Sequence, residues 1–331
     1  FEATESDISV ALLTDHLNTT KSKLAKQIGK RGVMEVLGDM QLLVGPPEQL
    51  CISNAALMMF CEHLDKFFPY TQVEITKFPE GSIKNPNNFI EVPVIKGSVP
   101  TMIKRTMEKL QDMVIEEKVT KVDYQMEAIR RYSYPYQALE EAVVNAFYHR
   151  DYQSYQAIII EIEPDCVRII SYPGIDRSIS QKTIAEGERF KSRYYRNKRL
   201  GEFLKELDLT EGKSTGIPTI QEELRDNGSP KATFETDDER RAVTVEIPIH
   251  PDFLMEQGEP QNEPQNEPQN ATSVEDAILQ LIRMNKYVTR EEMASQIEVS
   301  LSTVKRSINK LKTSGIIEYE GPSKGGYWSI K

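Results

Sequence analysis

Cysteine is scarce in this sequence, which has three among 331 residues: Cys51, Cys61 and Cys166. Their spacing is not that of a metal site, and three cysteines cannot build a disulfide framework, so we expect reduced thiols in a cytoplasmic protein. Long apolar runs are absent too, since no stretch approaches the ~18 apolar residues that a membrane span requires. The sequence opens on Phe1 without a secretory signal, and we expect a fragment whose upstream domain is missing.

Basic residues are outnumbered by acidic ones, with 41 Lys and Arg against 51 Asp and Glu. The formal net charge is -10, which argues against a protein that coats nucleic acid along its whole surface. The distribution is uneven, because from residue 302 onward six Lys and Arg residues stand against two Glu, a local balance of +4. A small basic module on an acidic body predicts local contact with nucleic acid. The sequence contains no G-x-x-x-x-G-K-[ST] loop, which excludes a helicase motor of that type.

A low-complexity segment divides the chain. The tetrapeptide EPQN occurs three times between residues 259 and 270. Proline at every fourth residue, with polar residues between, blocks helix and sheet hydrogen bonding, so we predict a flexible linker over residues 253–272. Before it we predict a helical connector at 1–47 and a domain at 48–252, and after it a domain at 273–331.

The central domain mixes helix and strand patterns. A short apolar helix is expected from Asn54, followed by strands at QVEITKF and FIEVPVIKGSV and by a helix at about 101–117. A second series, from Tyr134 to Ile249, predicts a helix, a hairpin, a polar loop region, another helix and a final strand AVTVEIPI. The fold class we predict is α+β.

The C-terminal segment predicts helix, helix, turn, helix and hairpin. Thr289 and Glu292 have the spacing of a capping box that opens the second helix. In the third helix Val304, Ile308 and Leu311 recur at i, i+4 and i+7 and are expected to form its buried stripe. This arrangement resembles a winged helix.

The outer face of that third helix is polar and basic. It carries residues that can contact phosphates and base edges in a major groove. With the expected tip of the hairpin they are Ser302, Thr303, Lys305, Arg306, Asn309, Lys310 and Lys324. We predict double-stranded DNA as the partner, and a winged helix that binds protein is the alternative.

One such module can meet only about four to six phosphates and would bind weakly alone. Two or more modules held together by the body would gain affinity through avidity. We therefore expect a homo-oligomer, a dimer or higher.

A polar stripe interrupts the apolar stretch EEAVVNAFYHRDY. Glu141, Asn145 and His149 are four residues apart and share one face of the expected helix. A carboxylate and an amide at this spacing can activate water and hold Mg²⁺ against phosphates. The stripe also fits a structural network in which Asn145 and His149 bond to buried backbone groups, with Arg150 and Asp151 paired at the helix end.

Four stretches together resemble a known family: PYQALEEAVVNAFYHRDY, IISYPGI, SRYYRNKRLGEFLKEL and TEGKSTGIPTI. They are similar to bacterial putative transcriptional regulators described as RecG C-terminal-like, whose ATPase domain is a divergent form of the GHKL fold. In that family a Schlafen-type, AlbA-like domain usually precedes these motifs and a winged helix often follows. The resemblance covers residues 48 to 250 and the tail, and it implies a two-layer domain of helices on an antiparallel sheet.

The resemblance also implies roles for individual residues. Glu141 would be the general base for water attack, and Asn145 the Mg²⁺ ligand. Gly174 would lie near the adenine of ATP, while Lys213, Thr215 and Gly216 would hold phosphate.

Two departures from the GHKL pattern bear on activity. Ser171, Tyr172 and Pro173 precede a lone glycine where the family has an Asp and two glycines, and Ser214 replaces the first glycine of the phosphate loop. We therefore expect a degenerate nucleotide-binding body that dimerises or senses a ligand. The alternatives are a scaffolding role and an active Mg-ATP-dependent ATPase that acts on DNA.

Overall fold

The computed structural model describes residues 3–121, 128–186, 195–210, 216–254, 274–297, 299, 301–313, 316–320 and 326–330. The chain divides into two compact units, Phe1–Pro260 and Gln261–Lys331. No helix in the described ranges is both long and apolar enough to cross a membrane.

The first unit begins with short helices. They are η1 (Glu5–Asp7), α1 (Val10–Thr19), η2 (Lys23–Lys26) and α2 (Val33–Asp39), followed by β1 (Leu43–Val44), β2 (Cys51–Ile52), α3 (Asn54–Phe60) and η3 (Leu64–Lys66). Serine caps three of them, because the side chains of Ser9, Ser22 and Ser53 accept hydrogen bonds from the backbone N–H groups of Leu12, Leu24 and Ala56. Leu13 and Leu37 are fully buried in the same hydrophobic core as α3. The N-terminal helices therefore pack on the domain that follows them.

A six-stranded sheet forms the centre of this unit. Its strands are β3 (Val73–Lys77), β4 (Ile90–Glu91), β7 (Ile158–Ile162), β8 (Cys166–Ser171), β9 (Thr233–Thr236) and β10 (Val243–Pro248). Their order is β4-β3-β7-β8-β10-β9. The pair β3 and β7 is parallel, with Ile75 opposite Ile160, and the other pairs are antiparallel.

The sheet differs from the expected one in the direction of one strand pair and in the length of one strand. The sheet is mixed rather than antiparallel, because helices lie between β3 and β7 and a long crossover returns the chain in the same direction. The expected strand FIEVPVIKGSV shortens to Ile90–Glu91, with a single bridge from Ile95 to Val73. Pro93 lies between the two paired points and cannot donate a ladder hydrogen bond.

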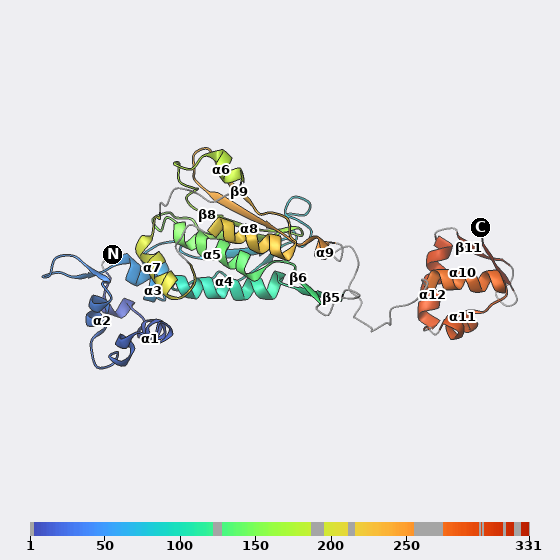
Figure 1. The fold of residues 1–331 in the computed structure, drawn as a ribbon, viewed down its shortest axis with the longest axis horizontal. Coiled ribbons are helices and arrows are strands. Elements are labelled where there is room, and N and C mark those ends of the chain that lie inside the picture. Colours follow the sequence, from blue (N-terminus) through green and yellow to red (C-terminus); the bar gives the residue numbers. More distant parts are fainter. Residues whose placement is uncertain are drawn as a thin grey trace. The chain divides into compact units, whose positions relative to one another are not determined.

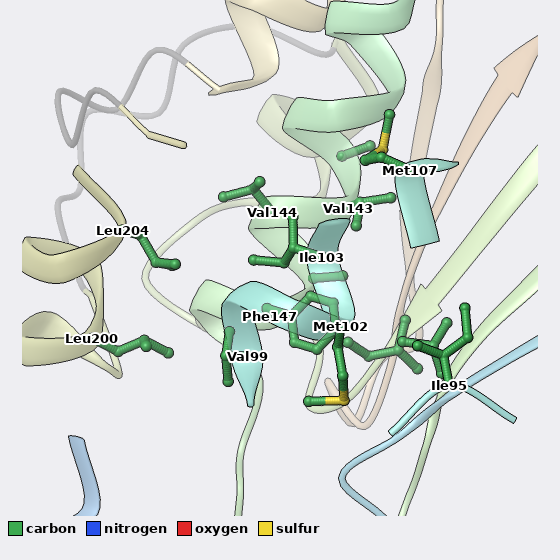
Figure 2. Close-up of a cluster of buried hydrophobic side chains, with 14 of the residues drawn as sticks. Ile95, Val99, Met102, Ile103, Met107, Val143, Val144, Phe147, Leu200 and Leu204 are labelled. Carbon is green, nitrogen blue, oxygen red and sulfur yellow. The ribbon is translucent and has the colours of Figure 1, made fainter. Parts of the chain in front are cut away.

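The larger helices of this unit are α4 (Val99–Val114), α5 (Tyr136–His149), α6 (Gln181–Glu186), α7 (Lys198–Glu206) and α8 (Gly216–Asn227), followed by the short α9 (Pro251–Leu254). A separate hairpin pairs β5 (Glu117–Thr120) with β6 (Ile129–Tyr132). Figure 1 shows α4, α5 and α8 side by side, and α5 contacts both of the others and β8. In the core between them, Ile103 of α4 lies beside Val144 and Phe147 of α5, with Leu204 of α7 facing them (Figure 2).

The second unit contains α10 (Val274–Met284), α11 (Arg290–Ile297), α12 (Leu301–Thr313) and a hairpin of β11 (Ile317–Glu320) and β12 (Tyr327–Ile330). The predicted stripe of α12 is confirmed, since Val304, Ile308 and Leu311 are buried. The Trp328 side chain donates to the Val288 carbonyl at 3.1 Å, which fastens the hairpin to the turn before α11.

The predicted capping box of α11 is also confirmed. The Thr289 backbone donates to the Glu292 carboxylate at 2.8 Å, and the Glu292 backbone donates to the Thr289 hydroxyl at 3.2 Å. Hydrogen bonds from the backbone and the side chain of Thr289 to the carboxylate lower the pKa of Glu292. Two N–H groups at the start of the helix are thus satisfied.

Candidate functional site

The polar stripe of α5 is built from two half-buried side chains. Ala142, Val143 and Ala146 bury the apolar face of the helix, so Glu141 and Asn145 point along its other side. The Asn145 Nδ2 group donates to Glu141 Oε1 at 2.9 Å. The amide and the carboxylate predicted to share a site therefore lie together, and they are bonded to each other.

The start of α8 closes on this pair. A side chain at Gly216 would place its Cβ 2.6 Å from both Asn145 Nδ2 and Glu141 Oε1. A residue larger than glycine at this position would require the ends of the Asn145 and Glu141 side chains to shift. The structure thus brings together three of the predicted site residues, Glu141, Asn145 and Gly216. The described residues do not include Lys213, Thr215 or Ser214, the residue that replaces a glycine of the phosphate loop.

Gly174 packs against the hairpin of β9 and β10. Its N–H donates to the Arg240 carbonyl at 3.0 Å, and an added Cβ would overlap Thr236 and lie 2.6 Å from the Ala242 carbonyl oxygen. This contact explains a glycine here without any ligand, and the adenine-side role stays a prediction. Ser171, where the family has a carboxylate, is buried. The nearby Asp176 carboxylate accepts from the Ser178 backbone at 2.9 Å, and its bonds to Ser178 lower its pKa.

His149 ends the stripe in an aromatic stack. Its ring lies 5.9 Å from the ring of Tyr195, which is itself stacked on Tyr148 at 5.2 Å. Crowding by protein atoms, with a contribution from Arg196, lowers the pKa of His149 to about 4, although the residue keeps an exposed edge. The imidazole is therefore neutral at neutral pH. Within the described residues neither His149 nor Asn145 bonds to a buried backbone group, so that part of the structural hypothesis is wrong.

Arg150 is buried at the end of α5, with 1% of its surface exposed. Its Nη2 group donates to the Tyr70 carbonyl at 2.9 Å, and its guanidinium lies 5.6 Å from the centre of the Tyr152 ring. Asp151 instead accepts from the Gln153 backbone, so the expected pair of Arg150 with Asp151 is not formed. Burial lowers the pKa of Arg150. The residue fixes the turn after α5 to the loop before β3.

Asn197 is a structural residue that the sequence did not reveal. Its amide donates to the carbonyls of Tyr148, at 2.9 Å, and Arg150, at 2.7 Å, which satisfies acceptors left open at the end of α5. Gly201, one turn along α7, allows the Tyr148 ring to lie where a Cβ would overlap it. The acceptors are almost fifty residues away in the sequence, so no local pattern could signal this role.

The exposed face of α12 carries the predicted contact residues. Lys305, Arg306, Asn309 and Lys310 are exposed, and Thr303 is half-buried. The side chain of Ser302 and all of Lys324 lie outside what is described. Two further cations of this unit were missed: Lys286, 4.6 Å from the ring centre of Tyr327, and Arg290, 5.8 Å from that of Trp328. Each is in a turn or at a helix start, where the spacing of helical residues gives no signal.

Comparisons with known proteins assign two parts of the chain. Residues 156–246 match the family model "Putative ATP-dependent DNA helicase recG C-terminal", and residues 274–327 match "HTH domain". No curated protein matches. The chain is similar in fold to the crystal structure of the DIP2311 protein from Corynebacterium diphtheriae, with a TM-score of 0.56 and 16% sequence identity.

That alignment covers 99% of this chain and 62% of the diphtheria protein, so the chain spans less than two thirds of that protein's length. Among the described residues no three His, Cys, Asp or Glu side chains are grouped as a metal site. The two family matches agree with the RecG C-terminal-like domain and the helix-turn-helix that the motifs predicted. The chain thus combines a recG C-terminal-type domain with a helix-turn-helix domain that follows it.

Proposed function

We propose that the protein is a DNA-binding transcriptional regulator whose second unit contacts duplex DNA through α12. The observation that carries this proposal is the division of α12 into two faces. One face packs in the core through Val304, Ile308 and Leu311. The opposite face exposes cations and an amide, among them Arg306 and Asn309. Cations of this kind neutralise phosphates, and Arg and Asn can bond to base edges in the major groove.

We further propose that the first unit is a ligand-sensing remnant of an ATP site. The Glu141 carboxylate and the Asn145 side-chain carbonyl are oxygen groups of the kind Mg²⁺ accepts, and the N–H groups at the start of α8 suit phosphate. These residues would hold the metal and the phosphates, and the metal would neutralise phosphate charge. The adenine side fits less well, because the buried Ser171 offers no carboxylate.

Active hydrolysis is the second candidate. It is favoured by the closeness of Glu141, a carboxylate that could accept a proton from water, to the start of α8. Against it stands the Asn145 amide, which already donates a hydrogen bond to one oxygen of the Glu141 carboxylate.

In the proposed regulator the first unit would also dimerise, which would bring two helix-turn-helix units together on the DNA.

The DNA-binding proposal is tested by selection from a random duplex pool with the full-length chain, followed by fluorescence anisotropy on the selected site. Arg306→Ala and Asn309→Ala should each weaken binding to the selected site by about 1–3 kcal/mol if they read bases. Lys109→Ala, an exposed cation on α4, is the matched control and should change nothing. Equal affinities for all four proteins would exclude α12 as the contact.

The body is tested by calorimetric titration with Mg-ATP and by an assay of phosphate release. For a sensing remnant we expect binding that Asn145→Ala weakens, with no phosphate release above the Glu141→Ala background. Release that Glu141→Ala abolishes would establish the ATPase instead. If none of these proteins gives a heat of binding, the result would favour a scaffolding role for the first unit. Sedimentation of the same samples reports whether the body dimerises.

A further inference from the structure

A buried histidine joins the N-terminal helices to α7. His16 of α1 keeps 5% of its surface exposed. Its ring lies 5.4 Å from the ring of Phe60 in α3 and 5.6 Å from that of Phe203 in α7. Three helices from distant parts of the sequence thus enclose one imidazole.

The two ring nitrogens of His16 are poorly hydrogen-bonded. Within the described residues neither ring nitrogen has a hydrogen-bond partner. The Nε2 atom is 3.3 Å from an oxygen of Glu206 on α7, but the pair does not have the alignment of a hydrogen bond. Asp15, on α1 itself, is the other charged group that acts on the ring, while α3 contributes the uncharged Phe60. Burial lowers the pKa of His16, and Glu206 and Asp15 oppose that effect without cancelling it.

The contact between α1 and α7 belongs to a longer chain of contacts. Arg199 of α7 donates to the Met40 carbonyl at 2.7 Å, which is a second link to the N-terminal helices. At its other end α7 follows Asn197, whose amide holds the last carbonyls of α5. α7 therefore stands between the N-terminal helices and the helix that carries Glu141 and Asn145.

We propose that His16 is a pH-responsive latch, whose neutral imidazole holds α1 against α7 and whose protonation releases it. A charged imidazolium in this enclosure would lose its water and gain only the half-exposed, misaligned Glu206 carboxylate. In the released state the ring regains water and takes up a proton more readily. Acidification through the ordinary histidine range therefore favours release, and the docked state is fully favoured above it.

The latch is independent of what the body binds. It makes the position of α7 depend on pH through α1, and α7 in turn contacts the end of α5.

Hydrogen exchange of the full-length chain, compared at about pH 7.5 and about pH 5.5 after correction for intrinsic rates, tests the latch. We expect amides of α1 and α7 to lose protection at the lower pH while those of α4 keep it. His16→Phe retains an aromatic ring without a titrating group and should abolish this loss. His63→Gln, at an exposed position next to α3, is the control and should leave the loss unchanged.

An equal loss in His16→Phe, or no loss in the wild type, would overturn the latch. Because a core substitution can unfold the region, Glu206→Gln gives a second test at an exposed position. It removes the charge that favours the protonated docked ring, so release should begin at a higher pH than in the wild type. An onset that stays the same or moves lower would equally reject the proposal.

Discussion

Two helices of this protein carry polar residues at helical spacing, and they use them in opposite ways. On α5, Glu141 and Asn145 are half-buried, bonded to each other and covered by the start of α8. On α12, Lys305, Arg306 and Asn309 are exposed to solvent. A polar stripe on a helix therefore does not reveal by itself whether it faces a partner or the protein.

The neighbours of each stripe make the difference. α5 is apolar on most of its surface and packs between α4, α8 and the sheet, so even its polar residues meet protein. α12 has a narrow apolar face and belongs to a small unit with one core, so the rest of the helix must remain outside. A stripe inside a broad apolar helix is a candidate for a buried site, and one beside a narrow apolar face is a candidate for a surface contact.

The largest expected effect separates the stability of the two units. Ile308→Ala empties a fully buried position of α12 and should destabilise the second unit by about 2–5 kcal/mol. Trp328 is the sole tryptophan, so its fluorescence reports on that unit alone. The matched change Leu139→Ala in α5 should shift the far-UV circular dichroism transition of the body and leave the Trp328 transition in place. One common transition shifted by both variants would show that the units fold together.

A smaller effect tests the packing of α7 on α5. Gly201→Ala puts a methyl group where the Tyr148 ring lies, and we expect a loss of about 1–3 kcal/mol from the body. Gly38→Ala is the control, since this helical glycine has only Leu43 at an ordinary 3.7 Å. It should stabilise by about 0.5–1 kcal/mol. Urea unfolding measures both, and equal effects would mean that α7 moves freely away from α5.

The capping box of α11 should contribute less again. Thr289→Ala removes the acceptor of the Glu292 N–H and should cost the second unit about 1 kcal/mol. Glu292→Gln keeps an acceptor for the other bond and should cost less than Thr289→Ala. The Trp328 fluorescence transition measures both variants, and a larger loss for Glu292→Gln would contradict this order.

The smallest expected difference is in the response to pH. Burial lowers the pKa of His16 and His250, and crowding lowers that of His149 to about 4. Between about pH 7.5 and about pH 5.5 the unfolded body takes up protons that the folded body excludes, so its free energy of unfolding should fall. All four histidines precede residue 251, so the Trp328 transition should stay constant over this range. A free energy of unfolding of the first unit that rises on acidification would contradict this prediction.

The sequence predicted what depends on neighbouring residues. The capping box at Thr289 and the buried face of α12 follow from the local spacing of residues. The sequence could not give what depends on distant partners. The Arg150 bond to the Tyr70 carbonyl spans eighty residues, and the parallel pairing of β3 with β7 depends on how two helices cross the sheet. These features are set by tertiary packing.

The most direct test of the central claim is the salt dependence of DNA binding by the full-length chain. The logarithm of the binding constant is plotted against the logarithm of salt concentration for the wild type, Lys305→Ala and the control Lys109→Ala. If α12 lies on duplex DNA, Lys305→Ala should weaken binding to all sequences alike and reduce the slope by about 1, while Lys109→Ala reproduces the wild type. Identical slopes for Lys305→Ala and the wild type would contradict the assignment of α12 to the DNA.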